Sequence, residues 1–145
     1  MSAGRICSRE VDLAEPRKSA QVAAVRMNAR NVGTLVVIDA DRKPIGILTD
    51  RDLAMKILAH GKNPFQTTVG DVMTSCPQTI DEETSIEDAI GVMRTGPFRR
   101  LPVVDDDRQL VGLLSLDDVL SLLAEEFSQI GRMVEREGPA ALTKF

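Results

Sequence analysis

Two short stretches of the chain place a hydroxyl three residues before a carboxylate, directly after a run of apolar residues. Thr49 precedes Asp52 in the first stretch, and Ser115 precedes Asp118 in the second. This spacing is typical of a capping box, in which both side chains accept hydrogen bonds at the start of a helix. The same geometry suits a ligand, because a carboxylate there accepts hydrogen bonds from ribose hydroxyls, while free backbone N–H groups meet a phosphate. Taken singly, each stretch favours the helix cap.

The two stretches belong to a tandem repeat. A shift of 66 residues aligns eleven identical residues within positions 19–58 without a gap, including Gly46 with Gly112. Each unit is too short to close a large core alone, so the two copies are expected to pack against each other. We place the first repeat at residues 6–62, the second at 63–124, and a helical extension with a tail at 125–145.

The sequence predicts the same order of helices and strands in both repeats. Apolar residues at helical spacing, β-branched runs that end on turn formers, and acidic connections predict a helix, a β-hairpin and a second helix. Short strands near residues 11–13 and 78–80 precede the first helices, and a short helix within 69–74 opens the second repeat. The expected first helices cover 19–30 and 85–94, and the expected hairpin strands cover 34–39, 45–48, 101–105 and 110–114. This order predicts a mixed α/β (α+β) fold with two β-α-β-β-α repeats.

Composition excludes several classes of function. The chain of 145 residues is 43% apolar and carries a net charge of -4, which argues against a nucleic-acid surface. Its longest apolar runs are far too short to span a membrane, and its start lacks the apolar stretch of a signal peptide, so we expect a cytoplasmic protein. Cys7 and Cys76 form no Cys-x-x-Cys pair, and we expect two free thiols.

The sequence offers no catalytic or metal-binding motif. His60, the single histidine, has no nucleophile or carboxylate motif beside it and is interpreted as a helix-end residue. The acidic triplet 105–107 is explained by a hairpin turn, because consecutive side chains in a turn diverge. We therefore predict a protein that is not an enzyme and has no metal site, and a small metal-dependent hydrolase is the weakest alternative.

Several motifs in order, each with a counterpart in the other repeat, resemble the cystathionine-β-synthase (CBS) domain family, as the tandem pair called a Bateman module. The motifs are Asn31-Val-Gly-Thr-Leu-Val-Val-Ile-Asp39, Gly46-Ile-Leu-Thr-Asp-Arg-Asp-Leu53, Val69-Gly-Asp-Val-Met-Thr74, Arg99-Arg-Leu-Pro-Val-Val-Asp105 and Gly112-Leu-Leu-Ser-Leu-Asp-Asp118. The resemblance covers residues 6–124. It implies pseudo-twofold symmetry and two clefts for adenosine ligands, of which we expect AMP, ADP or ATP, with S-adenosylmethionine or NAD as alternatives.

The resemblance also implies roles for individual residues. The carboxylates of Asp52 and Asp118 would bind ribose, and the hydroxyls of Thr49 and Ser115 would help to hold ribose or phosphate. The implied adenine-pocket residues are Leu13, Ala14 and Thr34 for one site, and Thr79, Ile80 and Pro102 for the other.

The two clefts are not expected to be equivalent. Arg99 and Arg100 stand where the first repeat has Gly33 and Thr34. Guanidinium groups donate paired hydrogen bonds to phosphate, so these arginines favour tighter phosphate binding near Asp118, or in the other cleft if an arginine reaches across the pseudo-twofold axis. The alternative is a solvated strand edge.

The C-terminal extension carries an apolar stripe, which continues at helical spacing to about Glu137 before Gly138-Pro139 stops the helix. The stripe comprises Val119, Leu120, Leu123, Phe127, Ile130, Met133 and Val134. Either it folds back on its own module, or it packs on a second subunit or a regulated partner. We expect a homodimeric sensor of adenine nucleotides that signals to an effector protein of unknown identity. The competing hypothesis is a structural or protein-interaction module whose clefts stay empty.

Overall fold

The computed structural model describes residues 1–75, 77–96 and 99–136. The predicted free thiol at Cys76 and the predicted helix stop at Gly138-Pro139 lie outside these ranges. Cys7 is a free, buried thiol, as predicted. No helix within the described ranges is long and apolar enough to cross a membrane.

The first half of the chain forms a four-stranded sheet in the order β1-β2-β3-β4. Strand β1 runs parallel to β2, while the pairs β2–β3 and β3–β4 are antiparallel. Helix α3 continues without a break into the π-helix η1. The elements are α1 (Ala3–Ile6), β1 (Leu13–Ala14), α2 (Ala20–Arg30), β2 (Thr34–Ile38), β3 (Pro44–Thr49), α3 (Asp50–Asp52), η1 (Leu53–Leu58), α4 (Val69–Val72) and β4 (Thr74–Ser75).

The second half repeats this order with a three-stranded sheet, β5-β6-β7. Strand β5 is parallel to β6, and β6 is antiparallel to β7. Its elements are β5 (Ile80–Asp81), α5 (Ile86–Arg94), β6 (Arg100–Val104), β7 (Leu110–Ser115) and α6 (Leu116–Arg136). The predicted mixed α+β class and the predicted hairpins are therefore confirmed.

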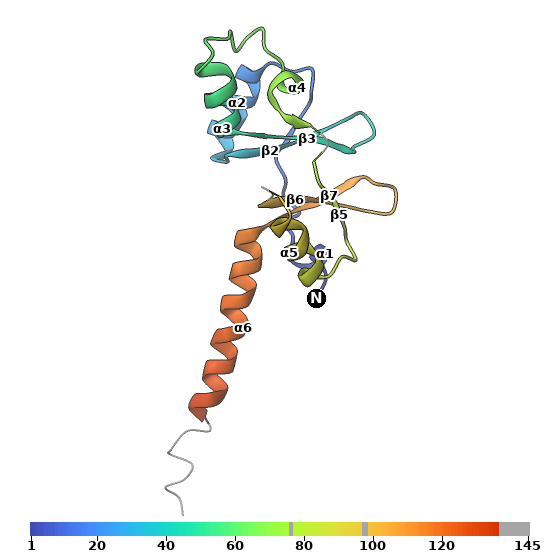
Figure 1. The fold of residues 1–145 in the computed structure, drawn as a ribbon, viewed down its shortest axis with the longest axis vertical. Helices are drawn as coiled ribbons and strands as arrows, with labels where there is room; N and C mark the ends of the chain where they lie inside the picture. The colour runs from blue at the N-terminus through green and yellow to red at the C-terminus, as the bar shows by residue number, and fades with distance from the viewer. Residues whose placement is uncertain (76, 97–98, 137–145) are drawn as a thin grey trace, which may run out of the picture.

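The two sheets lie one above the other, with helices on their outer sides (Figure 1). The hairpin loops touch, because the Leu110 backbone N–H donates to the Arg42 carbonyl over 2.9 Å. Each loop holds an arginine in the left-handed region, Arg42 at φ 62° and Arg108 at φ 66°. In the second loop, one Asp105 oxygen accepts from the backbone N–H groups of Asp107 and Gln109, so the acidic triplet builds a turn.

The short helices that open the two repeats are exchanged between the sheets. Helix α1 contributes Ala3 to the core beneath the second sheet, whereas α4 contributes Val69 to the core above the first sheet. The sequence predicts a short helix within residues 69–74 at the start of the second repeat. Along the chain it holds that position, but in space it packs on the first repeat.

Helix α6 leaves the second sheet and projects away from the rest of the molecule (Figure 1). Only Val119 within it is buried, and every residue from 123 to 136 is exposed. Of the two alternatives for the apolar stripe, folding back on its own module is not what the described chain shows, because the stripe beyond Val119 is not buried.

Candidate ligand-binding cleft

Both hydroxyl–carboxylate motifs form complete capping boxes. Asp52 Oδ2 accepts from the Thr49 backbone N–H over 2.9 Å, and the Thr49 hydroxyl accepts from the Asp52 N–H over 3.1 Å. Ser115 and Asp118 repeat this geometry at the same two distances, 2.9 and 3.1 Å. The cap predicted from the residues is confirmed in both repeats, and each cap uses a single carboxylate oxygen.

A third capping box shows that this motif alone does not indicate a ligand. Thr68 and Asp71 exchange the same pair of hydrogen bonds at the start of α4. These bonds hold the pKa of Asp71 below its ordinary value. A ligand site therefore has to be argued from what surrounds the second carboxylate oxygen.

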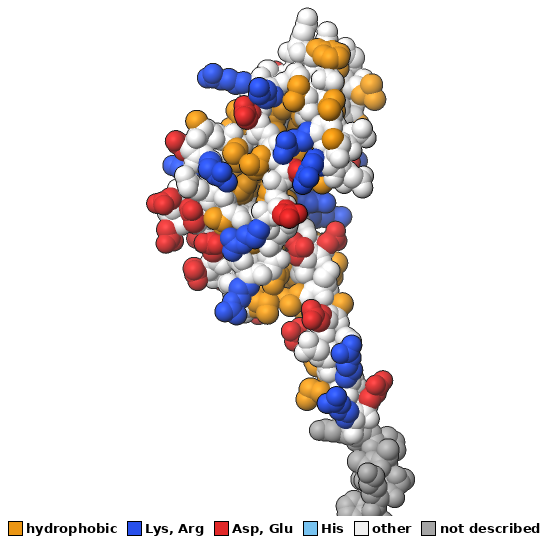
Figure 2. Space-filling model, turned by 180° about the vertical axis from the view of Figure 1, so that it is seen from behind, with side chains coloured by type: hydrophobic (Ala, Val, Ile, Leu, Met, Phe, Trp, Pro, Cys, Tyr) orange, Lys and Arg blue, Asp and Glu red, His pale blue; other side chains and the backbone are white. Residues whose placement is uncertain are grey.

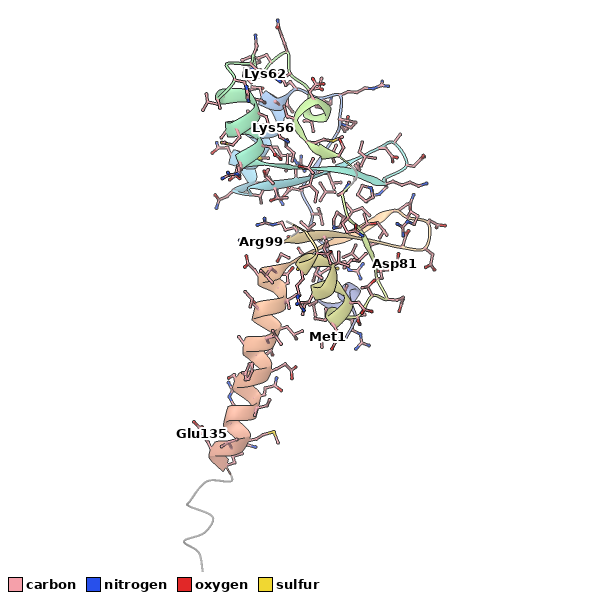
Figure 3. All side chains as sticks on the ribbon, in the orientation of Figure 1. Met1, Lys56, Lys62, Asp81, Arg99 and Glu135 are labelled. Atoms are coloured by element: carbon pink, nitrogen blue, oxygen red, sulfur yellow. The ribbon has the colours of Figure 1, made fainter. Side chains whose placement is uncertain are left out.

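The second carboxylate oxygens of the two repeats have different surroundings. Asp52 Oδ1 lies 3.2 Å from the ammonium nitrogen of Lys56, a residue on η1 that Figure 3 shows in the helical layer beside the first sheet. Lys56 also donates to the Val72 carbonyl over 2.9 Å, which holds it in place. Asp118 Oδ1 makes no hydrogen bond or ion pair with any described residue, so it keeps the acceptor capacity that a ribose would use.

Asp118 lines a cleft of about 310 Å³ between the two repeats. The cleft brings Asp118 and Ser115 together with Arg100 from the neighbouring strand and Thr34 from the first sheet. Arg100 is placed there because it pairs in register with Ser115 across β6 and β7. The full lining is Ser8, Glu10, Val11, Asp12, Val32, Gly33, Thr34, Arg100, Leu113, Ser115 and Asp118.

The segment 8–12 forms one wall of this cleft, and sequence reasoning missed it. Asp12 is held by the Arg30 guanidinium at 2.9 Å and lies 3.8 Å from Arg26, so its charge is compensated. Glu10 is the uncompensated carboxylate on this wall, since it takes part in no ion pair with a described residue. The segment has no motif and no identical counterpart in the alignment of the repeats, so its sequence carried no signal for the site.

The residues implied for the adenine pocket do not all lie in this cleft. Thr34 does, whereas Leu13 and Ala14 line a separate cavity of about 290 Å³ together with Val22 and Arg26 of α2. The structure therefore separates residues that the family resemblance had grouped in one site.

The residues implied for the other adenine pocket lie around β5 and β6. Ile80 and Pro102 are buried, and the Thr79 hydroxyl accepts from the Arg108 guanidinium over 3.2 Å. Arg99 lies just before β6, near the first turn of α6 (Figure 3), where its carbonyl accepts from the Leu116 N–H. None of these four residues lines the cleft that contains Asp118.

The rest of the described chain adds no other chemical centre. Within the described ranges, no group of three or more His, Cys, Asp or Glu side chains is placed to hold a metal ion. Burial raises the pKa of the Cys7 thiol, although the nearby Arg9 opposes this effect. A thiol that is neutral at physiological pH is a poor nucleophile.

Comparison with known proteins agrees with this architecture. Residues 3–59 and residues 69–125 each match the CBS domain. The chain belongs to the CBS domain family. Its two matched segments make it a tandem CBS pair, as the motifs indicated.

Similar CBS pairs have been crystallised with adenosine ligands. The protein CBSX2 of Arabidopsis thaliana, solved in complex with AMP, is 28% identical and aligns over 86% of this chain and 96% of its own with a TM-score of 0.72. The CBS domain pair of MJ0100, solved with 5′-methylthioadenosine and S-adenosyl-L-methionine, is also 28% identical and aligns over 85% and 99% with a TM-score of 0.74.

The uncharacterized protein MK0525 of Methanopyrus kandleri is 33% identical over 122 residues. The matched region is 84% of this chain but 62% of that protein, so this chain spans less than two thirds of its relative. The likeness therefore concerns the CBS pair and does not extend to the remainder of MK0525.

Proposed function

We propose that this CBS pair is a regulatory module that binds an adenosine ligand in the cleft containing Asp118. The main support for this proposal is that Asp118, Ser115, Arg100 and Thr34 line one cavity between the repeats. The crystallised complexes of two similar CBS pairs support an adenosine ligand. In this proposal Asp52 caps α3 and contributes to a second, weaker site, because its contact with Lys56 competes with ribose.

Each side chain in the cleft supplies a distinct interaction. Asp118 Oδ1 accepts hydrogen bonds from the ribose hydroxyls while Oδ2 keeps the cap. The Arg100 guanidinium donates to phosphate, and the Ser115 hydroxyl, which serves the cap as an acceptor, keeps its O–H to donate. Thr34 lies on the opposite sheet, so a ligand that reaches it spans both repeats.

The charge of the cleft favours a ligand with few phosphates. Arg100 is the one cationic residue of its lining, which also includes the carboxylates of Asp118 and Glu10. A triphosphate would bring several negative charges towards these carboxylates, whereas a monophosphate can be matched by one guanidinium. We therefore expect AMP to bind more tightly than ATP in the absence of divalent cations.

Isothermal titration with AMP, ADP, ATP, NAD and S-adenosylmethionine tests this proposal. We expect Asp118→Asn to weaken binding of the best ligand by at least about 10-fold, because a charged acceptor is lost. Asp71→Asn is the matched control, since it perturbs an equivalent capping box outside the cleft. We expect that variant to lose a similar amount of thermal stability and to keep native affinity.

Two results would contradict the proposal. The first is that none of the five ligands binds, which would favour the structural or protein-interaction module. The second is that Asp118→Asn and Asp71→Asn bind equally well, which would show that Asp118 only caps α6.

The output of the module is also part of the proposal. A ligand changes the packing of the repeats only to the extent that it binds one arrangement more tightly than another. We propose that a homodimer transmits this change to an effector protein, without catalysis by the module itself. Turnover of a nucleotide in the presence of added Mg²⁺ would overturn the non-enzymatic part of this proposal.

A further inference from the structure

Helix α6 exposes a continuous apolar surface beyond the body of the protein. Its large apolar side chains from Leu120 to Val134 are between 43% and 72% exposed. They are Leu120, Leu123, Phe127, Ile130, Met133 and Val134. Together they amount to an apolar surface of at least a few hundred Å², the size at which a patch marks an interaction site.

The spacing of this surface is that of a coiled-coil seam. Apolar residues recur at alternating steps of four and three through all 21 residues of the helix. The seam residues are Leu116, Leu120, Leu123, Phe127, Ile130 and Val134. A helix that only covers a globular core has a stripe with a period of 3.6 residues, whereas the seam residues recur every seven residues, which favours pairing with another helix, and Met133 widens the seam on one flank.

The opposite face of α6 is polar. Figure 2 shows acidic and basic side chains along the protruding part of the helix. In the protruding part, from residue 123 on, the charged residues outside the seam and its flanks are Glu125, Arg132, Glu135 and Arg136. Helix propensity alone gives little stability to a helix this exposed, so burial of the seam against a partner would stabilise residues 123–136.

Two copies of this seam are compatible with each other. In a parallel pair in register, the flanking position of Glu126 faces Gly131 of the second copy, while Val119, one heptad earlier, stays buried in its own module. No like charges are brought together. An antiparallel pair centred on the seam would place Glu126 opposite its own copy. The small residues Ala124 and Gly131 on one flank let the second helix approach closely.

We propose that α6 forms a parallel, two-stranded coiled coil with α6 of a second copy of this chain. Pairing of the two seams along about 30 Å of helix buries on the order of 1,000 Å² in total, which is the size that a specific interface needs. The inference rests on the homodimer in the proposed function and is independent of the ligand.

Sedimentation equilibrium of the full chain tests the pairing. We expect the native chain to be dimeric and Phe127→Glu to raise the dimer dissociation constant at least about 100-fold, because a central apolar contact is replaced by a buried charge. Gln129→Glu adds the same residue on the polar face and should change the constant less than about 3-fold. A monomeric native chain, or equal dissociation constants for the two variants, would overturn the proposal.

Disulfide trapping tests the orientation. A parallel pair in register brings residue 134 of both copies together, so Val134→Cys should form a covalent dimer under mild oxidation with copper phenanthroline. Arg132→Cys, on the outer face, should not. The native chain, which keeps Cys7 and Cys76, measures the background. Equal trapping of the two variants would refute the parallel seam. Ligand titration of Phe127→Glu separates the two proposals. If this variant no longer dimerises but binds the ligand with native affinity, the cleft functions independently of the pairing of α6.

Discussion

Gly46 and Gly112 occupy equivalent positions in β3 and β7, and the contacts at the two positions predict different costs of adding a methyl group. A Cβ at Gly112 would lie 2.5 Å from Cys7 Sγ and 2.9 Å from the Ser8 carbonyl oxygen. A Cβ at Gly46 would meet the Met73 side chain and lie 3.1 Å from the Thr74 carbonyl oxygen. The two glycines therefore leave room for the segments that follow the exchanged helices α1 and α4, and not for a ligand.

The side chains that meet these methyl groups differ in their freedom to move. Met73 is flexible and can swing its thioether away, whereas Cys7 is short and buried, and the Ser8 carbonyl is fixed because it accepts from the Leu113 N–H over 2.9 Å. Overpacking costs about 1–3 kcal/mol. We expect Gly112→Ala to lower the free energy of unfolding by about 2–3 kcal/mol and Gly46→Ala by about 1 kcal/mol.

Urea unfolding followed by circular dichroism measures both values. The control is Gly112→Ala made in the Cys7→Ala background. We expect the added methyl group to lower the free energy of unfolding less in that background than in the native chain, so the two single changes should not be additive. Equal costs at Gly46 and Gly112, or a larger cost at Gly46, would refute the argument that the short Cys7 side chain and the fixed Ser8 carbonyl decide the penalty.

Two pH-dependent effects follow from the shifted pKa values. The raised pKa of Cys7 favours the neutral thiol in the folded state, so its contribution to stability is complete below the ordinary value of 9.0 and is lost as the pH rises through the higher folded value. In the Cys76→Ser chain at pH 8, Cys7 should react with a disulfide reagent only after urea unfolding, and rapid reaction in the folded chain would contradict its burial. The lowered pKa of Asp71 contributes stability above the ordinary value of 3.8, which is lost as the pH falls through the folded value. Thr68→Ala should reduce this loss in acid unfolding experiments between pH 5 and 2, and an unchanged acid transition would show that the capping bonds do not set the shift.

The local elements could be predicted from the sequence because local residues determine them. Ser19 and Ser85 accept hydrogen bonds from the first turns of α2 and α5, and so begin both helices where the sequence indicated. The β-branched runs form the central strands of both sheets, and the acidic turns close both hairpins. Each of these features depends on neighbours within a few residues.

The exchange of the short helices could not be predicted in this way, because distant residues decide it. The backbone N–H of Ala3 donates to the Thr84 carbonyl, and that of Val69 donates to the Lys18 carbonyl. These two bonds are related by the same shift of 66 residues as the repeats. The aligned positions 19–58 and 85–124 begin after these segments, which share little beyond a glycine, so their side chains gave no indication that the backbone repeats there.

The polar residues of the candidate site could be predicted from the sequence, but the other residues that line the cleft could not. Ser115, Asp118 and Arg100 are neighbours across one hairpin, and their motif and register indicated the cluster. Thr34 was assigned to a site with Leu13 and Ala14, which line a different cavity in the structure. The contribution of residues 8–12 depends on the path of the chain between the sheets, and no local pattern specifies such a path.

That path gives the cleft a direct connection to both halves of the molecule. The segment 8–12 joins α1, which packs beneath the second sheet, to β1 in the first sheet. A ligand between Asp118 and Thr34 would contact this segment as well as both repeats. Because the exchanged helix α1 also contacts α6, packed elements connect the wall of the cleft to the start of the projecting helix. Coupling between ligand and dimer would then appear as a ligand-dependent dissociation constant, and by linkage as an equal change in ligand affinity on dimerisation.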